Sequence, residues 1–125
     1  MSRCGSNRSR RGIVAIEFAL IGAAFFLLLF VIVDIGRLVA ARTELRAAVG
    51  EVVRAAVADT TGPVCADPKS YALSRVSLLE PDALSVTAVC VTTSVTVTAE
   101  YVFTFIMPAF GTAPRTLRAV VSSPV

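Results

Sequence analysis

Histidine and tryptophan are absent from this 125-residue chain, and lysine occurs once, at Lys69. Histidine is the usual general base near neutral pH and the commonest metal ligand. Its absence excludes serine–histidine and cysteine–histidine nucleophiles and histidine-bound metal centres. The many serine and threonine residues therefore have no base to activate them. We expect a protein that is not an enzyme and that holds no metal, no cofactor and no small-molecule substrate.

Charged residues are also scarce. They make up 17% of the chain, against 55% hydrophobic residues, and the mean hydropathy is +0.76. A small soluble domain buries too little surface to hide so much apolar material, and a disordered chain is far more polar. We therefore expect the excess hydrophobic surface to lie in a membrane, against partner subunits, or both.

Positive charge is concentrated at the N-terminus. The first eleven residues contain no acid but four arginines, Arg3, Arg8, Arg10 and Arg11, and the remaining residues are close to neutral. Basic residues beside an apolar run stay on the cytoplasmic side of a membrane. These arginines thus predict a cytoplasmic N-terminus, and we expect no nucleic-acid partner because no binding motif accompanies the charge.

Residues 13–33 form an apolar run of 21 residues with one charge, Glu17, and no proline. A helix of this length covers about 30 Å, the thickness of a bilayer core. The run therefore predicts a transmembrane helix in contact with lipid. A cleavable secretory signal is the competing interpretation, since residues 39–41 could serve as its cleavage site. However, the run exceeds the usual apolar core of such signals, and Asp34 and Arg37 intervene.

Glu17 is the most informative residue of this run. A carboxylate in hydrocarbon is costly, so such residues usually pair or mark function. One interpretation is that Glu17 lies close enough to the helix start to reach the lipid headgroups. The local pattern offers another: a basic leader, residues 1–12, ends in Gly12, and an apolar helix begins at once, with Glu17 fifth and Phe18 sixth after the glycine.

This pattern resembles the prepilin-peptidase site of type IV pilins and pseudopilins. Over about residues 10–58 the chain resembles the TadE-like family, minor pseudopilins of the tight-adherence (Tad) pilus system. The segments that carry the resemblance are Arg11-Gly12, Ala15-Ile16-Glu17-Phe18-Ala19-Leu20, the apolar run, Asp34-Ile35-Gly36-Arg37, and the Ala/Arg-rich residues 45–58.

The resemblance implies that prepilin peptidase cleaves between Gly12 and Ile13. It also implies that Glu17 meets the new α-amino group of Ile13 on a neighbouring subunit, because each charge lowers the cost of the other in an apolar bundle. The implied partners are other pilin-like and minor pilin subunits and the inner-membrane pilus assembly platform. The implied place is the bacterial inner membrane, as a single-pass protein that acts in pilus biogenesis and surface adhesion.

Small residues recur every fourth position at Ala15, Ala19 and Ala23. Such a stripe lets a second helix approach closely. It lies on a different side of the helix from Glu17, since two residues correspond to about 200° of turn. We therefore expect helix contacts from more than one direction.

The helix is expected to continue beyond the membrane through residues 34–60. Its apolar positions recur at helical spacing, and Thr60-Thr61-Gly62-Pro63 ends it. One face is formed by Leu38, Leu45, Val49, Val52 and Ala56. The result is one helix of nearly 50 residues, half transmembrane and half amphipathic.

Residues 61–125 are expected to form a small extracytoplasmic α+β domain. Asp67-Pro68 is typical of a helix start, and the helix could extend to Glu80, before Pro81. Alternating apolar and polar residues predict antiparallel strands over 84–91, between 94 and 105, and over 116–122. The amphipathic half of the long helix is the natural cover for their apolar face. The predicted fold class is thus α+β and pilin-like.

Cys65 and Cys90 are the only cysteines that remain if the leader is removed. On the oxidising side of a bacterial inner membrane, a disulfide between them is expected, and two buried free thiols are the alternative.

The main functional alternative is an unprocessed single-pass anchor that displays a small envelope protein-binding domain. An anchor needs neither Gly12 before the helix nor Glu17 within it.

Overall fold

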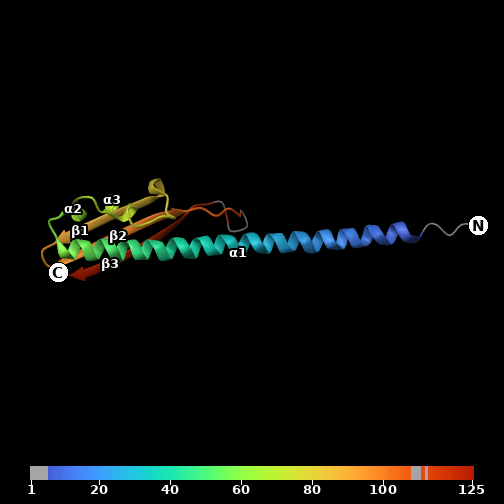
Figure 1. Ribbon diagram of the computed structural model, residues 1–125, viewed down its shortest axis with the longest axis horizontal. Helices are drawn as coiled ribbons and strands as arrows, with labels where there is room; N and C mark the ends of the chain where they lie inside the picture. The colour runs from blue at the N-terminus through green and yellow to red at the C-terminus, as the bar shows by residue number, and fades with distance from the viewer. Residues whose placement is uncertain (1–5, 108–110, 112) are drawn as a thin grey trace, which may run out of the picture.

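The computed structural model describes the backbone of residues 6–107, 111 and 113–125, and side chains from residue 12 onward within these ranges. Arg3 and the side chains of Arg8, Arg10 and Arg11 lie outside the described part. One long helix, α1, runs the length of the molecule, and the rest of the described chain packs beside its C-terminal half (Figure 1). This arrangement confirms the expected α+β class.

Helix α1 spans Ser6–Ala58, a length of 53 residues. The helix was expected to begin directly after Gly12, at Ile13, but it begins seven residues earlier, at Ser6, inside the leader. One glycine costs a helix only about 1 kcal/mol, and propagation from a long neighbouring helix offsets that cost. At the other end, the Asp59 carboxylate accepts a hydrogen bond from the Thr61 amide at 3.1 Å, and the turn before Pro63 stops the helix.

Three strands form an antiparallel sheet in the order β1-β2-β3: β1 spans Leu84–Val91, β2 spans Ser94–Phe103 and β3 spans Arg115–Pro124. Leu84 pairs with Tyr101 across the first ladder, and Phe103 pairs with Arg115 across the second. Every second residue of β2 from Val95 to Phe103 is buried. The sequence alternation therefore identified this strand and its buried face, although the predicted strand continued to Phe105 and β2 ends at Phe103.

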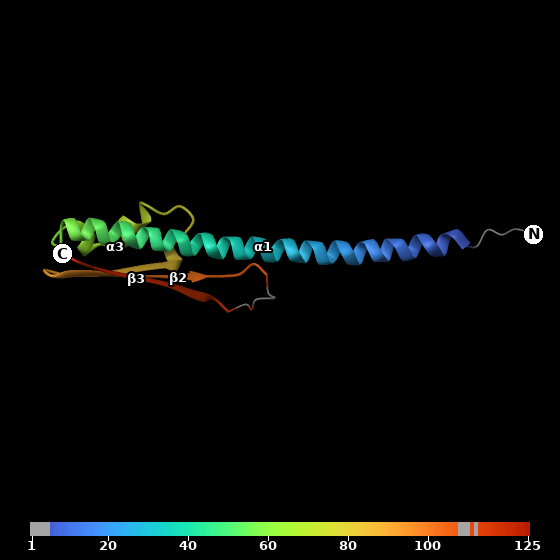
Figure 2. The same cartoon turned by 90° about the horizontal axis from the view of Figure 1, so that it is seen from below.

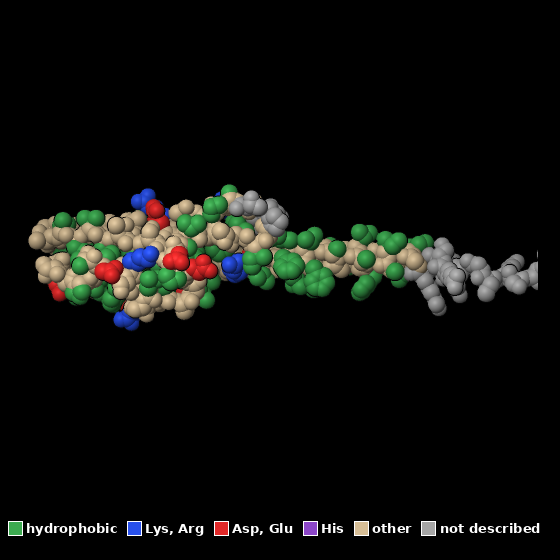
Figure 3. All heavy atoms as spheres, turned by 90° about the horizontal axis from the view of Figure 1, so that it is seen from above, with side chains coloured by type: hydrophobic (Ala, Val, Ile, Leu, Met, Phe, Trp, Pro, Cys, Tyr) green, Lys and Arg blue, Asp and Glu red, His purple; other side chains and the backbone are tan. Residues whose placement is uncertain are grey.

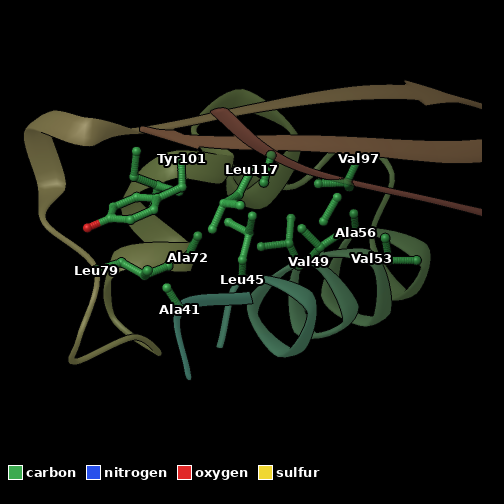
Figure 4. Packing of buried hydrophobic residues seen from close by; sticks show 14 of the residues in the cluster. Ala41, Leu45, Val49, Val53, Ala56, Ala72, Leu79, Val97, Tyr101 and Leu117 are labelled. Atoms are coloured by element: carbon green, nitrogen blue, oxygen red, sulfur yellow. The ribbon is translucent and has the colours of Figure 1, made fainter. Parts of the chain in front are cut away.

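The C-terminal half of α1 covers one face of this sheet (Figure 2). Its predicted apolar face is the one that is buried. Leu45 and Val49 point toward the sheet residues Val97 and Leu117 (Figure 4), and Val52 is fully buried in the same cluster. Burial of this apolar surface supplies the main favourable free energy for folding.

Short helices fill the connection between α1 and the sheet: α2 spans Pro63–Ala66, α3 spans Pro68–Leu73, and the 3-10 turn η1 spans Pro81–Ala83. Helix α3 begins as expected, with the Asp67 carboxylate accepting from the Ser70 amide at 3.1 Å. Its predicted extension to Glu80 is wrong, because the helix ends at Leu73. The amides of Ser77 and Leu78 donate to the Glu44 carboxylate of α1 at 2.7 and 3.0 Å instead of continuing the helix.

Candidate functional site

The N-terminal half of α1 is the first candidate site, because it is apolar and uncovered. No residue from 12 to 33 is buried, and α1 contains a window long and apolar enough to cross a membrane. On the face shown in Figure 3, the described part of this segment carries hydrophobic side chains, whereas the charged side chains gather on the domain. A chain with this one N-terminal apolar helix fits a single-pass membrane protein.

The predicted cleavage position lies inside this helix. Gly12 and Ile13 are both exposed, and a β-carbon added at Gly12 would meet no described atom within 4 Å. Packing among the described residues therefore does not require a glycine here. It does weaken the helix locally by about 1 kcal/mol relative to alanine.

Glu17 and Phe18 follow one turn later, and both side chains are exposed. Within the described residues, Glu17 has no ion-pair or hydrogen-bond partner. An unpaired carboxylate among apolar side chains has a strong tendency to acquire a cationic partner once water is excluded.

The alanine stripe is equally open. Ala15, Ala19 and Ala23 are all exposed, and Gly22 beside them has free space around its α-carbon. Small side chains on an exposed helix allow a second backbone to approach closely. This segment thus offers a carboxylate on one side and a flat, small-residue surface on another.

The end of the apolar segment holds a feature that the sequence reasoning missed. Asp34 is 1% exposed, and its carboxylate accepts hydrogen bonds from the amide of Ile106 at 3.2 Å and the amide of Met107 at 2.8 Å. The Arg37 guanidinium lies 3.3 Å from the same carboxylate and 5.4 Å from the centre of the Phe103 ring. Asp34 therefore fixes the segment that follows β2 to the helix.

Burial raises the pKa of Asp34, but the hydrogen bonds from Met107 and Ile106, together with the hydrogen bond and charge of Arg37, lower it by more. The pKa of this carboxyl consequently lies below its ordinary value. Asp34 remains ionised at neutral pH, where it is the stronger hydrogen-bond acceptor. The signal available in the sequence was an acid placed directly after the apolar run, within the Asp-Ile-Gly-Arg segment.

The two cysteines outside the leader pack against the hydrophobic core. Cys65 in α2 and Cys90 in β1 form a disulfide, with α-carbons 6.1 Å apart. The bond links the segment that follows α1 to β1, an edge strand of the sheet. Among the side chains of residues 12–107, 111 and 113–125, no group of three metal-ligating residues comes together.

No curated protein and no solved structure matches this chain. A family model does match it, and the match begins at the predicted cleavage glycine and runs through Glu17, Asp34 and all of the buried hydrophobic residues of α1 except Ala56. The TadE-like family points to a component associated with the Tad pilus. Residues 12–54 match the model of the TadE-like proteins, so the long helix of the chain is similar to members of that family.

Proposed function

We propose that this chain is a minor pseudopilin of a Tad-type pilus, a structural and assembly subunit that performs no catalysis itself. The observation that carries the proposal is an uncovered apolar helix with a glycine at its membrane entry and a carboxylate, Glu17, that has no partner among the described side chains and lies five residues after that glycine. Prepilin peptidase would remove residues 1–12. The chain would then remain in the bacterial inner membrane, with its C-terminal domain outside the cytoplasm.

Assembly would proceed through the exposed half of α1. The α-amino group of Ile13 on one subunit would pair with Glu17 on another, and the alanine stripe would seat a further helix. The partners would be other pilin-like and minor pilin subunits at the assembly platform. Because both charges are costly alone in hydrocarbon, their pairing would select one axial stagger between neighbouring helices.

Intact mass of the protein extracted from its native membrane tests the processing step. Cells with an active prepilin peptidase should contain a chain that begins at Ile13. Gly12→Leu should block cleavage, whereas Gly22→Leu should not. The two variants are matched, because a β-carbon added at either position meets no described atom within 4 Å. A full-length native chain in these cells would overturn the proposal.

Crosslinking to other pilin-like subunits tests the assembly step. Glu17→Gln keeps the shape of the side chain and removes its charge, so the partner amine would be left buried and unpaired, at a cost of about 3–5 kcal/mol. Complexes should therefore be lost. Glu51→Gln is the control, since Glu51 lies on the same helix but pairs only at the surface, with Arg54. A cleaved Glu17→Gln variant that assembles normally would refute the charge pair.

The unprocessed anchor remains a second candidate, favoured by one observation. Helix α1 continues without a break from Ser6 through Gly12, as it would in a chain that keeps its leader. The mass measurement separates the two functions. An anchor should also insert at least as well with Gln at position 17, because a neutral side chain is cheaper in hydrocarbon.

A further inference from the structure

The segment that follows β2 reaches toward the apolar half of α1 and lies beside the helix in both ribbon views (Figures 1 and 2). Its level along the helix is fixed by the two hydrogen bonds from Ile106 and Met107 to Asp34. Asp34 directly follows Val33, the last residue of the apolar run. Ile106 is therefore held at the level where the predicted transmembrane helix leaves the bilayer.

Asp34 explains why the segment lies at this level. A carboxylate next to hydrocarbon is costly unless donors surround it. Two backbone amides and the Arg37 guanidinium surround this one, and almost none of Asp34 is accessible. The segment after β2 thus covers the charge at the membrane boundary.

The side chain of Ile106, in this covering segment, is apolar and exposed. Ile106 is 64% exposed, although its amide is fixed to a buried carboxylate. The helix residues at the same level, Ile32, Val33 and Ile35, are also exposed and apolar. Ile106 follows a strand of the sheet and does not belong to α1. It therefore adds to the apolar surface that α1 presents at this level.

We propose that Ile106 inserts into the outer leaflet side of the membrane, at the boundary between lipid headgroups and acyl chains, and that Asp34 is the residue that positions it there. The C-terminal domain would then rest on the membrane at a defined height and rotation instead of standing free on its helix. Amphipathic helices that lie on a membrane bury their apolar faces about 5–10 Å into this boundary region, which sets the depth expected for an apolar side chain there. The proposal rests on the membrane insertion of residues 13–33 and is independent of cleavage and of pilus assembly.

Single tryptophan reporters test the proposal, because the chain contains no tryptophan. The full chain is placed in bilayers of phosphatidylethanolamine and phosphatidylglycerol, with bromine atoms near the ester end of some acyl chains. Ile106→Trp is the test variant, and Phe30→Trp reports whether the helix has inserted. Leu78→Trp is the matched control: Leu78 is 66% exposed, but its amide is bound to Glu44, ten residues or about 15 Å further along α1.

Bromine should quench the tryptophans at positions 30 and 106, with quenching at 106 about twofold or more above that at 78. Equal quenching at 106 and 78, with strong quenching at 30, would overturn lipid contact by Ile106. Weak quenching at 30 would overturn the insertion on which the proposal depends. Neither result bears on whether prepilin peptidase cleaves the chain, which the mass measurement decides.

A second variant tests the role of Asp34. Asp34→Asn, combined with Ile106→Trp, keeps the side-chain shape but replaces one acceptor oxygen by a donor group that opposes a backbone amide. Quenching at position 106 should fall toward the value at position 78, whereas Glu51→Asn in the same background should leave it unchanged. Unchanged quenching in the Asp34 variant would refute the positioning role.

Discussion

The disulfide between Cys65 and Cys90 is expected to provide a large share of the stability of the folded part of the chain. The bond joins α2 to β1 across a sequence separation of 25 residues. Closing a loop of that length lowers the entropy of the unfolded chain by an amount worth about 3.5 kcal/mol at 25 °C. Small domains have total stabilities of only about 5–15 kcal/mol. Loss of this bond should therefore lower the melting temperature by roughly 14–28 °C, at about 4–8 °C per kcal/mol.

Two perturbations isolate the bond. Reduction of the native chain breaks it and keeps both cysteine side chains, and the double variant Cys65→Ala/Cys90→Ala removes the sulfurs as well. Thermal unfolding in detergent micelles can be followed by tyrosine fluorescence, because Tyr101 is buried in the core and the chain has no tryptophan. Both perturbations should shift the transition in the same direction and by similar amounts.

Cys4→Ser is the control, since Cys4 belongs to the leader and takes no part in the bond. Its melting temperature should equal that of the native chain. If the reduced chain and the double variant both melt within about 4 °C of the native chain, the loop-entropy reasoning is refuted. Ready labelling of both thiols in the denatured, non-reduced protein would show instead that the cysteines are free and that packing alone holds the domain.

Two further predictions concern Leu45, in the packed half of α1, and Asp34, at the end of its apolar half. Leu45→Ala should lower the free energy of unfolding by about 2–5 kcal/mol, because Leu45 is 2% exposed and its removal leaves a cavity; the exposed Val39→Ala should change it by less than about 0.5 kcal/mol in the same denaturant titration. Asp34 should stabilise the fold fully above its unfolded pKa of about 3.9, and this contribution should be lost as the pH falls through its lower folded pKa. Below about pH 4 the melting temperature of the native chain should thus fall more steeply than that of Asp34→Asn, and parallel acid slopes would contradict this assignment.

The long helix and the sheet could be predicted because their signals are local. Apolar residues spaced three and four apart in α1, and the strict alternation in β2, each identify an element and the face that it buries. The strand over Leu84–Val91 has the predicted bounds, and β3 extends the predicted strand by one residue before Thr116 and two after Ser122. No long-range information was needed for these elements.

The errors arose where a distant side chain competes with local structure. The apolar spacing of Ala72, Val76 and Leu79 is helical, and both Ala72 and Leu79 are buried. Even so, Glu44, 33 residues from Ser77 in sequence, captures the backbone amides that a longer α3 would have used. The role of Asp34 was missed for the same reason, because its donors lie 72 and 73 residues away.

The residues of the candidate site also fall into two groups: those with partners inside the chain and those without. Asp34 acts within the chain, so its partners are visible in the fold. Gly12, Glu17 and Ala19 have no packing role in the described structure, and the roles proposed for them involve other molecules: a peptidase, a charged terminus and a neighbouring helix. Resemblance to the TadE-like family, rather than the physics of one folded chain, therefore carries those three assignments.

The two halves of α1 consequently face different requirements, although they form one continuous helix. Residues 12–33 are uncovered, so a substitution there has little effect on the folding of the sheet and its cover; its cost appears only in lipid or against a neighbouring subunit. From Ala41 onward, by contrast, the helix supplies part of the hydrophobic core, and substitutions at its buried positions act on stability first. Asp34 stands between these two regions, and its contacts turn the end of the apolar helix into an attachment point for the domain. A substitution that impairs assembly at an unchanged melting temperature should therefore lie N-terminal to Asp34. A substitution that lowers the melting temperature should lie C-terminal to it.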